Sequence, residues 1–291
     1  MTELFTVAKS APITGLSTTS YGQSTISMPN KCITYVRETG EPLGVVGNDY
    51  NIMQPTEVYD LVENITGNAP TVRWNGKVMI MQSKINSMLL PGDDEVDTMF
   101  TVVNSFDGTS SLHAMGISFR MICHNQLNMA LRQSKENNLR YSMRHKGDFD
   151  SKLEAFVQAS ESIARGHAQF ERRVAALVQR KVTSGDIESL WKQVTPVVLN
   201  LTKNDIENKK DLQELRIKGF VNYCKETYET ERDRGIPDSM WLAANAVTKF
   251  IQHNESTRGR KVNEDTRYID NAVGLRSKLI SKVMNHALQE V

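Results

Sequence analysis

The spacing of apolar residues divides this chain into two kinds of sequence. Between residues 31 and 149, short apolar runs are separated by turn residues, which is typical of strands; from Asp150 onward, apolar residues recur every three or four positions, which is typical of helices. The sequence therefore predicts an α+β fold, with an antiparallel three-strand meander flanked by helices in the N-terminal half and a mainly helical C-terminal half. We expect three parts: a flexible N-terminal arm over residues 1–30, an α+β core domain over 31–149 and a helical domain over 150–291.

The first elements follow from turn and cap residues. Residues 8–30 are rich in Ser, Thr, Gly and Pro without a sustained period, which favours a flexible arm over a packed element. From Lys31, two short strands are predicted around the turn residues Glu38 to Pro42. Pro55 then begins a helix that Gly67 ends, because proline suits the first helical turn and glycine suits the position after the last.

Three strands follow, TVRWNGKVMIMQSKI, VDTMFTVVNSF and SLHAMGISFRMICHNQ. The first is expected to bend at Asn75 and Gly76. The second and third are joined through Asp107 and Gly108, and a D-G pair between apolar runs is a strong hairpin signal. The next segment, NQLNMALRQSK, is predicted to be helical.

The C-terminal half carries a helical stripe from Leu153 to Val178, which predicts one long amphipathic helix of about seven turns at ~3.6 residues per turn. Further helices are predicted at 186–201, 208–231, 239–253 and 266–288. The segment IPDSMWLAANAVTKFIQH has its large apolar residues, Trp241 among them, in the pattern of a packing face.

Composition narrows the possible functions. The 39% hydrophobic and 24% charged residues belong to a globular protein, and the net charge of +1 excludes nucleic-acid binding by bulk charge alone. Three widely spaced cysteines without a C-x-x-C pair predict neither a disulfide framework nor structural zinc, so a reducing cytoplasm fits best. We expect no secretion and no membrane span, because no run approaches ~18 apolar residues.

Catalytic chemistry has one candidate stretch, which contains Asp107, His113, Cys123 and His124. Successive side chains on a strand point to opposite faces, so Cys123 and His124 make poor catalytic partners, and Cys123 follows the alternation of a small buried hydrophobe. Asp107, His113 and His124 lack a metal-ligand spacing, and Ser105, Asp107 and Gly108 have an ample interpretation as turn residues. Phosphate loops and G-x-S-x-G elbows are absent from the sequence. We therefore predict no catalytic residue, no metal and no cofactor.

A local excess of positive charge points to nucleic acid instead. Residues 116–181 contain twelve Lys or Arg against six acidic residues, and NNLRYSMRHKG places cations and a histidine beside Tyr141. Cations for phosphates next to an aromatic ring for bases suit single-strand binding, although a solvated loop between two helices explains the same pattern. Trp74, near Arg73 and Lys77, could stack a base or simply cover the sheet.

Four stretches in order, LGVVGNDYNIMQPTEVYDLVENI, VNSFDGTSSLHAMGISFRMICHNQLNMAL, SMRHKG and MWLAANAVTKFIQH, resemble a phage and plasmid family of unknown function from about Lys31 to the C-terminus. The residues that match its motifs are Asp107, Gly108, Arg120, Cys123, Asn125, Arg144 and His145. Relatives commonly carry another polar residue at the position of His124, which makes a required Cys-His pair less tenable. The resemblance implies mobile DNA as the context and supplies no mechanism.

A second resemblance is topological: a helix, a three-strand meander and a following helix are similar to the core of Rad-fifty-two-type annealing proteins. Those proteins form rings with single-stranded DNA in a basic groove. This likeness implies strand annealing as an activity, but only at the level of the fold.

The leading hypothesis is a non-catalytic, single-stranded DNA-binding protein of a phage or plasmid. It would promote annealing or recombination in the host cytoplasm as a homo-oligomer, a ring or a filament, with a phage exonuclease or a single-strand-binding protein as candidate partners. The residues predicted to contact nucleic acid are Arg73, Trp74, Lys77, Arg120, Asn125, Arg140, Tyr141, Arg144, His145 and Lys146.

Two alternatives stay open. One is an interaction protein that counters a host defence system, with the acidic residues Asp93, Asp94, Glu95 and Asp97 of LLPGDDEVD as its contact face. The other is a metal-dependent nuclease, whose divalent ions would be held by the carboxylates of Asp93, Asp94, Asp107 and Asp148.

Overall fold

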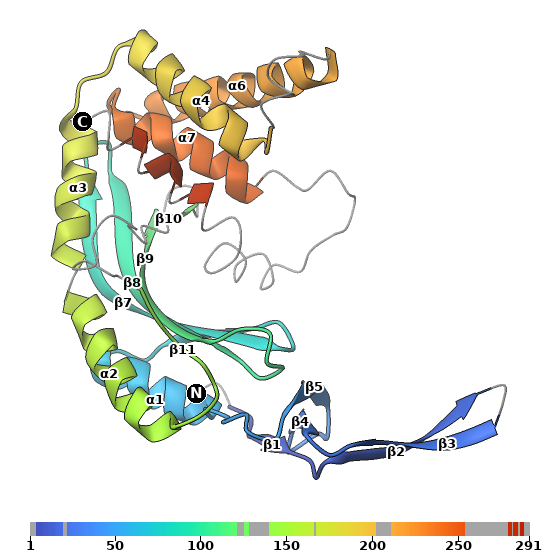
Figure 1. Cartoon of the computed structure of the whole chain (residues 1–291). Coiled ribbons are helices and arrows are strands. Elements are labelled where there is room, and N and C mark those ends of the chain that lie inside the picture. Colours follow the sequence, from blue (N-terminus) through green and yellow to red (C-terminus); the bar gives the residue numbers. More distant parts are fainter. Residues whose placement is uncertain are drawn as a thin grey trace. The chain divides into compact units, whose positions relative to one another are not determined.

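The computed structural model describes residues 4–19, 22–120, 125–127, 140–165, 167–201 and 211–253, with short helical pieces at 279–280, 282–284 and 286–287. It combines helices with antiparallel sheets, and helices dominate the C-terminal half, which confirms the predicted α+β class (Figure 1).

The chain folds into two compact units. Unit 1 consists of Met1–Lys84, Phe100–Met115 and Arg140–Ala164, and unit 2 of Ile85–Met99, Gly116–Leu139 and Arg165–Val291. This division does not follow the boundaries at 30 and 149 that the sequence suggested. The reason is that the long strands β7, β8 and β9, described below, each contribute residues to both units.

A small sheet in unit 1 has the order β1-β4-β5, formed by β1 (Val7–Lys9), β4 (Lys31–Val36) and β5 (Pro42–Gly47). The two strands predicted around residues 38–42 are therefore confirmed. β2 (Ile13–Thr19) and β3 (Gly22–Met28) pair with each other as an antiparallel hairpin. The sequence predicted a flexible arm over residues 8–30 rather than a packed element, and it did not indicate the backbone pairing of these two strands, because composition alone shows no apolar period here. The flexibility of this arm stays a prediction.

The main sheet has the order β10-β9-β8-β7-β6, and β11 also pairs with β9. Its strands are β6 (Thr71–Trp74), β7 (Val78–Leu90), β8 (Asp94–Ser105), β9 (Leu112–Arg120), β10 (Asn125–Leu127) and β11 (Arg140–Met143). The predicted meander corresponds to β7, β8 and β9 at its centre.

Two local predictions in this sheet need correction. The bend expected at Asn75 and Gly76 is a complete hairpin turn, in which Asn75 Oδ1 accepts the backbone N–H groups of Lys77 (3.1 Å) and Val78 (2.8 Å). Residues 125–127 form β10 rather than the start of a helix, because they pair with β9 in the register Asn125↔Arg120. The rest of that predicted helix lies outside the described residues, as do Cys123 and His124.

Two helices belong to unit 1. α1 (Pro55–Thr66) begins with its proline in the first turn and ends at Gly67, whose φ of 72° is left-handed, as predicted. α2 (Phe149–Arg165) buries Phe156, whose ring meets the edge of Tyr141 at a centroid distance of 5.9 Å. Side-chain and backbone hydrogen bonds from Ser151 lower the pKa of Asp148, which caps the start of α2.

Unit 2 contains α3 (His167–Gln179), α4 (Ser184–Val198), α6 (Asp211–Arg232) and α7 (Met240–His253). The stripe predicted as one long helix from Leu153 to Val178 is helical in α2 and in α3, and Gly166 between them lies outside the described residues. α7 packs against α4 and α6 (Figure 1), and every residue from 240 to 248 is buried, which confirms its structural role. No helix in the described part of the chain is long and apolar enough to cross a membrane.

The indole of Trp241 offers a test of this core. Its Nε1 donates to Asp94 Oδ2 at 3.2 Å, and Asp94 is 0% exposed. Replacing Trp241 with phenylalanine removes a donor from a buried carboxylate, so we expect a loss of about 1–3 kcal/mol in the free energy of unfolding, measured by urea denaturation. Trp191→Phe is the matched control, because Trp191 Nε1 donates to the neutral carbonyl of Ala243 at 3.2 Å. Equal losses in the two variants would show that the carboxylate does not matter.

Candidate functional site

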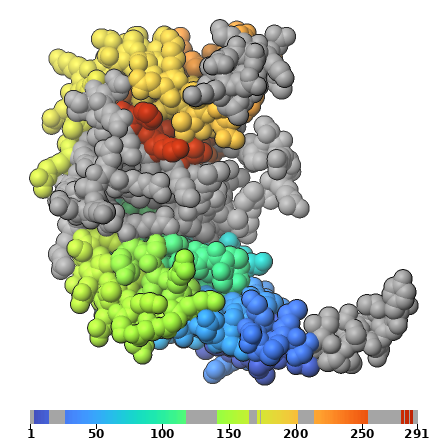
Figure 2. All heavy atoms as spheres, in the orientation of Figure 1, coloured from blue at the N-terminus to red at the C-terminus, as the bar shows by residue number. Residues whose placement is uncertain are grey.

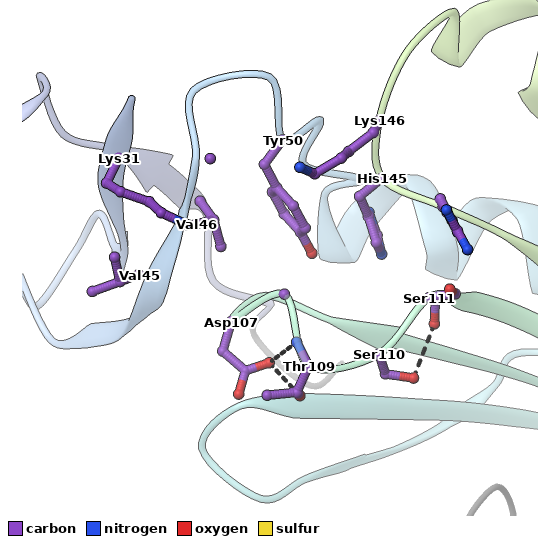
Figure 3. Close-up of a pocket in the computed structure, with 13 residues that line it drawn as sticks. Lys31, Val45, Val46, Tyr50, Asp107, Thr109, Ser110, Ser111, His145 and Lys146 are labelled. Carbon is purple, nitrogen blue, oxygen red and sulfur yellow. Dashed lines mark hydrogen bonds between the residues drawn. The ribbon is translucent and has the colours of Figure 1, made fainter. Parts of the chain in front are cut away.

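A pocket of about 340 Å³ lies within unit 1, where three segments of the chain meet (Figure 3). The first segment comprises β4, β5 and the residues that follow β5; the second is the connection between β8 and β9; the third follows β11. The residues that line the pocket are Lys31, Val45, Val46, Gly47, Tyr50, Asp107, Gly108, Thr109, Ser110, Ser111, Arg144, His145 and Lys146.

The β8–β9 connection is held by its own side chains. Asp107 Oδ1 accepts both the backbone N–H (3.0 Å) and the hydroxyl (2.6 Å) of Thr109, and Gly108 takes a left-handed φ of 76°. Ser105 Oγ donates to Ser110 O at 2.8 Å and accepts from Ser110 N at 3.2 Å. The interpretation of Ser105, Asp107 and Gly108 as turn residues is confirmed, and the turn is a preformed wall of the pocket.

The backbone of β5 packs directly against the β8–β9 connection at Gly44. A Cβ atom on Gly44 would lie 2.5 Å from Cβ and 2.6 Å from Cα of Asp107, so only glycine fits here. Thr34 Oγ1 donates to Phe106 O at 2.5 Å and ties β4 to the same connection. The position of Asp107 therefore depends on the small sheet.

The third segment is attached through Asn51. Asn51 N donates to His145 O at 2.7 Å, and the side-chain amide of Asn51 donates to Gly147 O at 3.3 Å. In the space-filling view, the yellow-green surface of residues 140–165 accordingly adjoins the blue surface of the N-terminal strands (Figure 2).

His145 is a buried side chain of the pocket. It is 3% exposed, and its ring stacks on Tyr50 with a centroid distance of 4.7 Å and an interplanar angle of 24°. Both rings point toward the β8–β9 connection (Figure 3). Nδ1 lies 3.0 Å from Asn51 O, and because a carbonyl only accepts, Nδ1 carries a proton and Nε2 presents a lone pair in the neutral ring. Nε2 is buried and has no hydrogen-bond partner among the described residues.

Burial shifts the protonation of both stacked rings. It lowers the pKa of His145 below its ordinary value of 6.5, against the opposing effect of the hydrogen bond to Asn51, so the imidazole is neutral at pH 7. Burial also raises the pKa of Tyr50 to about 12, and the Tyr50 hydroxyl donates to Ser105 O at 2.6 Å. Neither ring is charged at neutral pH.

The charge of the pocket comes from its rim. The cations Lys31, Arg144 and Lys146 are exposed, and Asp107 is the carboxylate among the lining residues. Lys146 Nζ lies 3.4 Å from Asp49 Oδ1, with side chains 57% and 64% exposed. An exposed pair of this kind contributes at most about 1 kcal/mol, so it does not prevent Lys146 from binding an anion.

The structure brings together some of the residues predicted to bind nucleic acid. Arg144, His145 and Lys146 line the pocket, whereas Tyr141, on β11, packs on Phe156 of α2. Arg140 precedes Tyr141 on β11, paired with Met115.

The β6–β7 hairpin lies beside the same connection, because Lys77 O accepts from Phe106 N at 3.0 Å. Lys77 is exposed and Arg73 is half-buried. Trp74 contacts Phe5 (centroids 5.0 Å apart) and Phe106 (5.6 Å), so its ring covers the sheet. These contacts support the packing role of Trp74, and stacking on a base stays a prediction.

Arg120 and Asn125 belong to unit 2, where they are register partners in the β9–β10 pair. Sequence reasoning missed Lys31, Tyr50 and the hydroxyls of Thr109, Ser110 and Ser111. Tyr50 and the three hydroxyl residues lie in LGVVGNDY and NSFDGTSS, which belong to stretches behind the family resemblance, whereas no sequence signal pointed to Lys31.

The next residues to place are His113, considered as a metal ligand, and the acidic residues of LLPGDDEVD. His113 on β9 contacts hydroxyls, with Nδ1 2.6 Å from Ser142 Oγ and Nε2 3.1 Å from Ser110 Oγ. Across the described residues, no group of three His, Cys, Asp or Glu could hold a metal ion. The acidic face expected in LLPGDDEVD was wrong for Asp94 and Asp97, which are only 0% and 8% exposed because they fold into the core of unit 2.

Comparison with curated proteins gave no match, and comparison with solved structures gave none. A protein-family model covers most of the chain and includes every lining residue of the pocket except Lys31. The chain belongs to the family described as Domain of unknown function (DUF932), whose model matches residues 42–273.

Proposed function

We propose that this protein binds single-stranded DNA without catalysis and promotes strand annealing or recombination as a homo-oligomer. The protein would act in the cytoplasm of a cell that hosts a phage or plasmid. Its candidate partners are a phage exonuclease and a single-strand-binding protein. One observation carries the binding proposal: Lys31 and the pair Arg144 and Lys146 come from distant segments and line one pocket.

The lining has the groups that bind phosphate in proteins. Guanidinium and ammonium groups contact phosphate oxygens by charge-assisted hydrogen bonds, and hydroxyls such as those of Thr109 and Ser110 add neutral donors. Gly108 lets the backbone approach an anion closely, because it has no side chain. The pocket therefore suits a phosphate of the DNA backbone.

A single strand fits this site better than a duplex. The volume of about 340 Å³ is at the low end of the roughly 300–1,000 Å³ typical of small-ligand pockets, which suits one unit of a flexible chain. A duplex holds its phosphates on a stiff helix and cannot direct one into a pocket without deformation. With a net charge of only +1, the protein depends on such local contacts for binding.

Fluorescence anisotropy tests the proposal. A labelled oligothymidylate is titrated with protein at several salt concentrations, beside a duplex of equal length. We expect the oligothymidylate to bind at low salt. The logarithm of its binding constant should fall linearly with the logarithm of the salt concentration, with a slope of about 0.7 for each phosphate contacted. The duplex is expected to bind more weakly. Absence of binding to the oligonucleotide at low salt would remove the proposal.

A further inference from the structure

One ring nitrogen of His145 is left without a hydrogen bond inside the protein. A buried polar atom without a hydrogen bond is destabilising, and Nε2 has no partner among the described residues. It belongs to a ring that lines a pocket rimmed by cations. At this place a ligand in the pocket can supply the missing hydrogen bond.

The tautomer restricts what that ligand can be. With its proton on Nδ1 toward Asn51 O, neutral His145 offers only a lone pair at Nε2. A lone pair repels a phosphate oxygen, which also offers only lone pairs. A proton placed between the two atoms converts this repulsion into a charge-assisted hydrogen bond.

We propose that the pocket holds one phosphate group of a nucleic-acid backbone, and that this phosphate binds together with one proton carried by Nε2 of His145. The inference rests on the proposed function in one respect, that the phosphate belongs to a DNA strand.

The proton balance is simple. In the free protein the imidazole is neutral, and in the complex it is an imidazolium that donates Nδ1–H to Asn51 O and Nε2–H to a phosphate oxygen. The proton comes from solvent, and no covalent bond forms or breaks in protein or ligand. The phosphodiester stays a monoanion, so the complex gains one proton relative to its separated parts.

The surroundings of His145 favour protonation of its ring only when the anion is present. Burial keeps the pKa of the free imidazole below 6.5, and the phenol of Tyr50 stacked on it is neutral because its own pKa is about 12. An anion at Nε2 raises the pKa, because it stabilises the charged ring. The charged side chains that line the pocket with His145 are Lys31, Asp107, Arg144 and Lys146, and Asp49 lies beside Lys146.

The sign of the pH dependence follows. Where free His145 is neutral and bound His145 is charged, each unit of falling pH strengthens binding by about tenfold, since one proton enters the binding equilibrium. Below the pKa of the free ring, the dependence levels off because the protein is already protonated.

Calorimetry counts the proton directly. An oligothymidylate without terminal phosphates is titrated at pH 7 in two buffers of different ionisation enthalpy, because its diester linkages do not change protonation near neutral pH. The expected uptake is close to one proton per strand bound in a pocket. Inorganic phosphate as a competitor shows whether a free anion occupies the same site, and an oligomer with uncharged methylphosphonate linkages is expected to lose both the binding and the proton uptake, because it offers no negative charge to the pocket.

His145→Gln removes the titrating group, so proton uptake and the pH dependence are expected to disappear while the salt dependence persists. His286→Gln is the matched control, since it removes a histidine of unit 2. If His145→Gln does not fold, as judged by circular dichroism, the proton count on the unaltered protein decides.

The outcomes separate this inference from the proposed function. Oligonucleotide binding with no proton uptake overturns the inference and leaves DNA binding intact. Failure to bind the oligonucleotide, together with pH-dependent binding of inorganic phosphate that His145→Gln abolishes, supports the pocket chemistry and removes DNA as its ligand. Binding of neither probe overturns both.

Discussion

A variant with Lys31, Arg144 and Lys146 all replaced by glutamine is expected to bind single-stranded oligonucleotides about 100-fold more weakly than the unaltered protein at low salt. Each cation that contacts a phosphate contributes on the order of 1 kcal/mol or more, and three such losses correspond to about two powers of ten. The slope of affinity against salt should also become less steep by about 2, since each lost contact removes about 0.7. Anisotropy titrations at several salt concentrations measure both quantities.

The control removes the same number of charges elsewhere. Lys192 on α4 and Lys218 and Lys225 on α6 are exposed side chains of unit 2, and changing all three to glutamine alters the net charge equally. This variant is expected to bind within about threefold of the unaltered protein, because none of the three lysines lines the pocket. Equal losses in the two variants would assign binding to overall charge, and an unchanged salt slope in the pocket variant would exclude the pocket as the phosphate site.

Gly44→Ala is expected to destabilise unit 1 by about 3 kcal/mol and to weaken oligonucleotide binding along with it. The added methyl group would lie 2.5 Å from Cβ of Asp107, a separation that forces the backbone of the β8–β9 connection to move. That connection is held by Thr34 at Phe106 O and by Tyr50 at Ser105 O, so it cannot move without straining these bonds. Urea denaturation measures the loss of stability.

Gly219→Ala supplies a control of opposite sign. Gly219 is an exposed residue of α6, and a Cβ atom there meets nothing within 4 Å. Alanine in a helix is favoured over glycine by roughly 0.5–1 kcal/mol, so this variant should be slightly more stable. If Gly44→Ala instead matched the unaltered protein, the close approach of β5 to Asp107 would not constrain the pocket.

Local chemistry explains which elements were predictable. Pro55 and Gly67 bound α1 because proline and glycine satisfy the ends of a helix within a few residues. The Asp107-Gly108 turn formed as expected, since the Asp107 carboxylate and the freedom of glycine act locally. By contrast, β10 was mistaken for the start of a helix, because its partner β9 supplies hydrogen bonds that no local pattern encodes.

The candidate site was only partly predictable for the same reason. The sequence singled out Arg144, His145 and Lys146 as a basic cluster but gave no reason to place Lys31 with them. Trp74 was an ambiguous aromatic until its contacts with Phe5 and Phe106 were known. The sequence suggested Asp94 as part of an acidic contact face for another protein, yet Asp94 is fully buried beside Trp241.

The sequence by itself determined the α+β class, both ends of α1 and the presence of a local basic segment, because periodicity, caps and turn residues act over short distances along the chain. Only the tertiary structure decided that Lys31, the β8–β9 connection and His145 share one pocket. Such meetings depend on the pairing of strands far apart in sequence. Burial then sets the protonation of His145 and Tyr50, and it exists only once the chain has folded.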